Sequence, residues 1–139
     1  MIKLTEEYLT KTAEEQAKLF ANRFGKRKGQ LRKFYDDFKV IDRRLLEDEN
    51  EERFKNELLP LVKFVKAKIA YSVGRKVQNE QLVPPEFKKY MDGEIDKIQS
   101  IADFKNFLLH YQAIISYFTY LTELESSPRG NEGFKGGRR

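Results

Sequence analysis

The stretch from Phe104 to Leu121, FKNFLLHYQAIISYFTYL, decides the fold of this chain. Its apolar side chains recur at intervals of three and four residues, which is the spacing of one face of an α-helix. They are Phe104, Phe107, Leu108, Tyr111, Ile114, Ile115, Phe118 and Leu121. Ser100 stands before the stretch, and Asp103 stands three residues after Ser100. This spacing resembles the capping box that begins many helices. We therefore predict a long helix here, the most apolar one of the protein.

Four other segments carry the same helical spacing, and none alternates apolar and polar residues as a strand does. They are Leu9–Phe24, Leu31–Leu45, Phe54–Val73 and Phe87–Ile98. In the third segment we expect Leu61 on the core stripe with Val62, Val65 and Ile69. A helical row facing away from that stripe is expected to hold Lys68, Ser72, Arg75 or Lys76, and Asn79. Thr5 is placed to cap the first segment, and Pro85 is placed to open the last. Pro60 lies inside the third, where we expect a kink or a restart of the helix. The sequence thus predicts an all-α fold, a compact bundle of about five helices.

The length of 139 residues suits a single domain with a sizeable core. We assign residues 1–125 to that helical domain. Residues 126–139 are polar, contain Gly and Arg, and are predicted to form a mobile tail. The chain has no Cys, and no apolar run is long enough for a membrane span or a signal peptide. We expect a cytoplasmic protein without membrane contact.

Few residues in the chain are suited to catalysis. His110 is the only histidine, and it lies in the most apolar segment, where a packed structural role is typical. No His, Asp and Glu residues have the spacing of a metal site. The loop Gly25-Lys26-Arg27-Lys28-Gly29 is not followed by the Lys-Ser/Thr pair of a phosphate-binding loop. We therefore predict no catalytic residues, no metal and no cofactor.

The charges of the chain are segregated. Two windows, Gln16–Tyr35 and Leu58–Asn79, contain no acidic residue although the chain has 22 of them, and they hold 12 of its 27 Lys and Arg. An ordinary surface mixes both signs, so this pattern predicts a polyanionic partner. Nucleic acid is the first candidate, because its phosphates supply negative charge along a line.

We select eight basic side chains from these windows as candidate RNA contacts, and so regard residues 1–125 as an RNA-binding domain. They are Lys26, Arg27, Lys28, Arg32 and Lys33 in the first window, and Lys68, Arg75 and Lys76 in the second. Contacts to phosphates position RNA without reading its sequence, so we expect binding that is largely independent of sequence. In contrast, Lys97 and Lys105 stand near Asp96 and Asp103, and we expect these two bases to be neutralised.

Several of these residues have a structural explanation beside the functional one. Lys and Arg opposite a core face are commonly only solvated. Tyr71 is either a base-stacking residue or part of the core, and Gly74 permits either a close RNA backbone or close helix packing. Phe64, Tyr117 and Tyr120 lie off the main helical stripes, where they serve either assembly or a wider core.

Two stretches of the chain resemble a known family. Gln30-Leu31-Arg32-Lys33-Phe34-Tyr35 and KAKIAYSVGR, residues 66–75, are similar to signatures of the small (Csm-type) subunit of type III-A CRISPR effector complexes. The last helix, with Phe104, Phe107 and Tyr117, is similar to the C-terminal segment of that family, so the resemblance covers roughly residues 20–125.

The resemblance implies a non-catalytic helical subunit of a ribonucleoprotein for antiviral defence. Its implied partners are single-stranded RNA, as guide, target or both, and the other subunits of the complex, including copies of itself. Two alternatives remain open from the residues. One is a helical scaffold or adaptor that binds acidic protein surfaces, and the other is the small subunit of a type III-B complex, which shares the all-α design.

Overall fold

Five helices of twelve or more residues dominate the computed structural model, which describes residues 1–25, 27–77 and 80–126. The α-helical elements are α1 Glu6–Leu9, α2 Lys11–Phe24, α3 Gly29–Glu47, α4 Glu51–Arg53, α5 Leu59–Gly74, α6 Pro85–Asp96 and α7 Ile101–Ser126. A π-helical turn, η1, spans Phe54–Leu58, and two short strands are β1 Lys76–Val77 and β2 Glu80–Gln81. The all-α prediction is confirmed. The predicted tail, apart from its first residue at the end of α7, lies outside the described residues.

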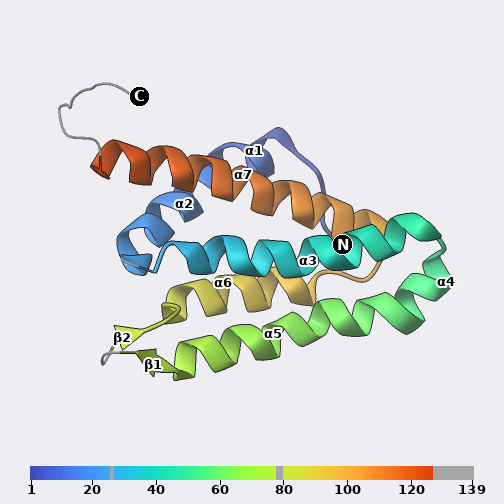
Figure 1. Ribbon diagram of the computed structural model, residues 1–139. Helices are drawn as coiled ribbons and strands as arrows, with labels where there is room; N and C mark the ends of the chain where they lie inside the picture. Colours follow the sequence, from blue (N-terminus) through green and yellow to red (C-terminus); the bar gives the residue numbers. More distant parts are fainter. Residues whose placement is uncertain (26, 78–79, 127–139) are drawn as a thin grey trace.

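The helices pack in neighbouring pairs around α3. Helix α2 packs along α7, α5 packs along α6, and α3 contacts both α5 and α7 (Figure 1). Burial is nearly complete for the aromatic side chains where these helices meet, among them Phe34, Phe87, Phe107 and Tyr111. The buried hydroxyl of Tyr111 donates to the backbone carbonyl of Leu31 at 2.5 Å, so burying it leaves no unpaired polar group there. Within the described residues, no helix is both long and apolar enough to cross a membrane.

The predicted starts of helices are confirmed in detail. The hydroxyl of Thr5 accepts from the Tyr8 amide at 3.1 Å, and Pro85 opens α6. The hydroxyl of Ser100 accepts from the Asp103 amide at 3.1 Å at the start of α7. The expected restart is found: the π-helical turn η1 ends at Leu58, and α5 begins at Leu59 with Pro60 in its first turn. The wider turn of η1 accommodates the chain before Pro60, which has no backbone N–H to donate.

Three local expectations were wrong. The first helix is interrupted at Thr10, whose φ of −119° and ψ of −81° separate α1 from α2. Lys76 lies on a two-residue antiparallel ladder, paired with Gln81, and not on the end of a helix. Leu61, expected in the core, is 36% exposed, because α5 buries a narrower stripe through Val62, Val65 and Ile69.

The two ends of α3 differ sharply in charge. Its N-terminal end follows the basic loop at Gly25–Lys28, whereas its C-terminal end enters an acidic turn toward α4 (Figure 1). The exposed acids of that turn are Glu47, Asp48, Glu49, Glu51 and Glu52. The start of α3, at Lys28, and the acidic turn therefore lie at opposite ends of the bundle.

Candidate nucleic-acid interface

The first basic window is folded into the start of α3. Gly25 ends α2 with φ of 54°, a left-handed conformation that glycine adopts without strain, and the chain then turns back into α3. The first turn of α3 contains no acid, and its N-cap Lys28 makes no side-chain capping bond. The positive end of the helix dipole thus adds to the charge of the exposed bases Lys28, Arg32 and Lys33. Lys26 lies outside the described residues.

These three bases line one groove. It lies between α3 and α7, has a volume of about 540 Å³, and is bordered on the α7 side by Ile115, Phe118, Thr119 and Thr122. The acids Asp36, Asp37 and Glu123 also line it. Across the described ranges, Lys28, Arg32 and Lys33 have no ion-pair partner. Their charges are therefore available to an anion.

The second basic window is divided by the fold. The ammonium of Lys63 donates to the backbone carbonyl of Ile95 at 2.6 Å, and Lys66 forms an ion pair with Asp96, so both bind the C-terminal end of α6. Burial lowers the pKa of Lys63, although the carboxylate of Asp96 acts in the opposite direction. Neither lysine was among the selected contacts, and the structure gives both a structural role.

The three selected bases of this window lie after Lys63 and Lys66, toward the C-terminal end of α5 and beyond it. Lys68 is exposed and stands 4.0 Å from the carboxylate of Asp37 on α3, so its charge is partly balanced. Arg75 and Lys76 are exposed, and neither has an ion-pair partner in the part of the chain that the structure describes. The row expected through Ser72 was wrong, because the side chain of Ser72 is buried.

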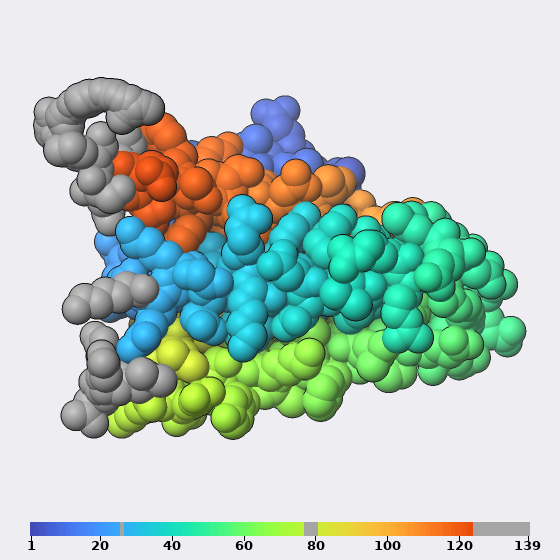
Figure 2. Space-filling model, in the orientation of Figure 1, coloured from blue at the N-terminus to red at the C-terminus, as the bar shows by residue number. Residues whose placement is uncertain are grey.

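The structure brings bases of both windows together. Lys33 of α3 and Lys68 of α5 line a groove of about 340 Å³ between the two helices, with Phe64 and Tyr71 on its α5 wall. We call the described set Lys28, Arg32, Lys33, Lys68, Arg75 and Lys76 the basic end. Figure 2 shows the start of α3 and the last turns of α5 at the same end of the face in view.

Arg27 stands apart from the basic end. It borders a different hollow, together with Arg23, Gly25 and the Pro84–Glu86 segment. Arg23 in turn forms an ion pair with Glu86 at 3.5 Å. Sequence spacing alone placed Arg27 with Lys28, but the turn after Gly25 separates the surfaces on which they lie.

Lys97 and Lys105, the two bases expected to be neutralised, both form ion pairs. Their partners are not the neighbouring Asp96 and Asp103. Lys97 binds Glu94 at 2.9 Å, one helical turn earlier, and Lys105 binds Glu49 at 2.6 Å across the bundle. Asp103 is occupied elsewhere, because its carboxylate accepts from the backbone amides of Ile2 and Gln99.

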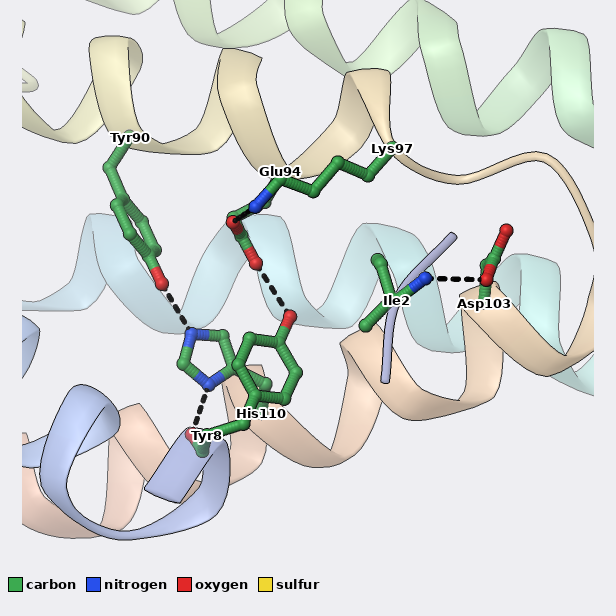
Figure 3. A network of polar contacts seen from close by, with 7 residues as sticks. All are labelled: Ile2, Tyr8, Tyr90, Glu94, Lys97, Asp103 and His110. Carbon is green, nitrogen blue, oxygen red and sulfur yellow. Dashed lines mark hydrogen bonds and ion pairs between the residues drawn. The ribbon is translucent and has the colours of Figure 1, made fainter. Parts of the chain in front are cut away.

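A buried polar network lies away from the basic end (Figure 3). Tyr8 of α1, Tyr90 and Glu94 of α6, and His110 of α7 point toward one another. Burial lowers the pKa of His110, and the hydrogen bond to the Tyr8 carbonyl opposes that effect. The imidazole makes hydrogen bonds through both nitrogens, so the expected structural role of His110 is what the geometry supports. Sequence reasoning did not find Tyr8 or Glu94, which carry no periodic signal of their own.

Metal ligation finds no support in the geometry. Among the described residues, no group of three or more His, Asp or Glu side chains is arranged to hold a metal ion. Taken together, the site is a set of exposed cations beside two shallow grooves on an all-helical scaffold. These features define a class of protein, the small all-helical protein with exposed bases gathered at one end.

The comparison with protein families identifies the chain more closely. Residues 3–123 match the family described as Csm2 Type III-A, and the chain belongs to this family, the small subunit of type III-A CRISPR effector complexes. It is therefore a non-catalytic structural subunit, as predicted, and the type III-B alternative is set aside. Membership implies partnership with other subunits of the complex and with CRISPR RNA. No curated protein and no solved structure matches the chain.

Proposed function

We propose that the basic end binds the phosphate backbone of RNA within the type III-A complex. The observation that supports this is that its cations gather at one end of the described bundle and, except for Lys68, stay open there, whereas several other lysines of the chain are held in place. Lys63, Lys66, Lys88, Lys97 and Lys105 are held by carboxylates or a carbonyl. In the described ranges, five of the six basic-end side chains have no such partner. Charges left open on one end of a protein are what a polyanion needs.

The RNA is the guide, the target or both, and binding is largely blind to sequence, because open Lys and Arg side chains neutralise phosphates and do not read base edges. The shallow, open grooves favour a strand lying along the surface over a base held in a deep pocket. We further propose that the subunit works in the cytoplasm and contacts copies of itself. Phe64 and Tyr120 are 57% and 61% exposed, so a wider core does not account for them, whereas Tyr117 is partly buried against the core.

Salt dependence tests the RNA contact directly. The full-length protein is titrated into fluorescently labelled single-stranded RNAs of unrelated sequence at several salt concentrations. Each phosphate contact contributes roughly −0.7 to the slope of log K against log salt for a single strand. The pair Arg32→Ala with Lys33→Ala should flatten the slope by about 1.4 for every RNA sequence, as should Arg75→Ala with Lys76→Ala.

A charge-matched control is available in the same chain. Lys88→Ala with Lys105→Ala removes two positive charges that already bind Asp92 and Glu49, so the slope should hardly change. Equal losses from control and test variants would show that net charge alone drives binding. Strong preference for one RNA sequence would contradict the proposal. The alternative of a scaffold for acidic proteins predicts that unrelated RNA fails to displace an acidic protein partner.

A further inference from the structure

An unusual row of side chains runs along the exposed face of α5. Phe64, Lys68, Tyr71 and Arg75 follow one another at intervals of four, three and four residues, so they form one stripe of the helix or its end. Aromatic rings and cations alternate along it. Phe64 is 57% exposed and Tyr71 is 66% exposed, so neither ring is used by the core of the chain.

Each ring of the stripe has a cation beside it. The ammonium of Lys68 is 5.9 Å from the centroid of Phe64, and the guanidinium of Arg75 is 6.0 Å from the centroid of Tyr71. Lys33 on α3 lines the same groove as Tyr71. An exposed ring among cations matches the way single-stranded nucleic acids are held, with bases stacked on aromatic faces and phosphates on Lys and Arg.

The two halves of the stripe differ in their neighbours. Both rings border the groove that holds Lys33 and Lys68, but Phe64 also borders a second groove with the exposed apolar side chains of Leu61 and Val40. Tyr71 borders only the first of these two grooves and has Arg75 beside its ring. Of the described residues, Asp37 is the one acid lining the groove at Tyr71, and it stands 4.0 Å from Lys68. Charge complementarity therefore favours a nucleotide at Tyr71 over an acid-poor protein surface.

We propose that Tyr71 is a base-stacking residue, with Arg75 and Lys33 holding the flanking phosphates of a single-stranded segment. The inference rests on the proposed RNA binding and adds to it, because phosphate contacts alone need no exposed ring. Arg75 has no ion-pair partner within the described residues, so it is able to turn from the ring to a phosphate when a base arrives. Phe64 lies two helical turns away, about 10 Å along the axis, so one base cannot cover both rings.

The experiment separates stacking from charge. Full-length protein is titrated with a labelled single-stranded RNA and with the same RNA carrying abasic positions, which keeps the phosphates and removes the bases. Tyr71→Ala should weaken binding of the intact RNA by about five-fold to about a hundred-fold, leave the salt slope unchanged, and hardly affect the abasic RNA. Tyr71→Phe should retain binding, because the ring is kept. The fluorescence of 2-aminopurine placed in the RNA should be quenched by stacking in the parent and in Tyr71→Phe, but not in Tyr71→Ala.

Tyr120→Ala is the matched control. Tyr120 is a tyrosine of similar exposure, 61%, on α7, and no cation is found over its ring among the described residues. Because Tyr120 is proposed above to contact a second copy, the titrations use a protein concentration at which the parent is monomeric. Under that condition Tyr120→Ala should bind both RNAs as the parent protein does, and both variants should unfold like the parent because neither ring is buried. If the parent protein binds no RNA, the proposed function fails. If it binds RNA with the expected salt slope and Tyr71→Ala binds equally well, only the stacking inference fails. Loss of binding to a partner subunit or to a second copy, with RNA affinity unchanged, would overturn it in favour of a protein contact.

Discussion

The imidazole of His110 stacks on the ring of Tyr8, with centroids 3.7 Å apart and planes inclined by 10°, and its Nδ1 donates to the backbone carbonyl of that same residue at 2.6 Å. The other nitrogen, Nε2, accepts from the hydroxyl of Tyr90 at 2.5 Å. This arrangement fixes the neutral tautomer with its proton on Nδ1. A single side chain of α7 thereby joins α1 and α6, which are far apart in the sequence.

Stability should fall on mild acidification because of this histidine. Burial lowers the pKa of His110 below its usual 6.5, so below about pH 7 the unfolded chain binds a proton more readily than the folded chain does. Unfolding free energy should therefore decrease as the pH falls from about 7 through the lowered pKa. Urea unfolding at pH 7.5 and 5.5 measures the effect. His110→Gln should be less stable at both values but show a smaller difference between them, since no other histidine exists. An unchanged difference would assign the pH dependence elsewhere.

Asp103 should confer a separate sensitivity at lower pH. Burial alone would raise its pKa, but hydrogen bonds from the amides of Ile2 and Gln99 outweigh burial and the pKa is lowered overall. The stabilisation is present above about pH 3.8 and is lost as the pH falls through the lowered pKa. Asp103→Asn should cost about 1.5–3 kcal/mol at neutral pH, the range for hydrogen bonds to a charged group. Its unfolding free energy should also change less below pH 4 than that of the parent protein.

Lys63 and Lys33 should respond in opposite ways to the same substitution. Lys63→Met removes the hydrogen bond to the Ile95 carbonyl and should cost about 1 kcal/mol of stability without changing the salt slope for RNA. Lys33→Met removes an exposed charge of the basic end and should leave stability nearly unchanged while reducing the slope by about 0.7. Chemical unfolding and RNA titration on both variants check the pair. The reverse pattern would show that the surface around Lys63, and not the basic end, contacts RNA.

Gly74 gives a test of close approach by RNA. A Cβ at this position meets no atom of the described chain within 4 Å, so close helix packing within the protein does not explain the glycine. Gly74→Ala should stabilise the end of α5 by about 0.5–1 kcal/mol. If an RNA strand passes close to this backbone, the same variant should bind RNA more weakly. Gly93→Ala on α6 is the control, because that glycine is equally unobstructed and should gain stability without loss of RNA binding. Unimpaired binding by Gly74→Ala would place the RNA elsewhere.

Gly25, at the end of α2, is the contrasting glycine. Its φ of 54° is strained for any residue with a side chain, so Gly25→Ala should cost about 1 kcal/mol although the space around it is open. Because Gly25 sets the turn into α3, the variant should also alter RNA affinity more than Gly93→Ala does. Thermal unfolding and the RNA titration measure both effects. A variant as stable as the parent would mean that the turn tolerates another conformation.

Sequence reasoning predicted the helices well because their signals are local. Thr5 and Ser100 accept from amides within one turn of themselves, and Pro85 fixes its own φ at the start of α6. The apolar period of α7 specifies its buried face directly. The break at Thr10 has no such signal, since nothing in the residues around it disfavours a helix strongly. It follows from the docking of Tyr8 onto His110, a contact between residues 102 positions apart.

The candidate site was less predictable because the state of a lysine depends on its distant neighbours. Lys63, Lys66 and Lys68 look alike in an acid-free window, yet Ile95 and Asp96 engage the first two and Asp37 stands near the third. Tyr71 was ambiguous for a related reason. Its exposure depends on how wide a stripe α5 buries, and that width is set by α3 and α6, not by the residues of α5 alone.

The acidic turn at the far end of α3 has a consequence for how the molecule meets its partner. Helix α3 has 19 residues and is about 28 Å long, so opposite charges are held apart over nearly three Debye lengths at 0.1 M salt. The field of a polyanion therefore attracts the basic end more strongly than the far end, where Lys105 and Arg53 already bind some of the acids. Under the proposed function, the subunit would approach RNA with its basic end turned toward the phosphates before the first contact forms.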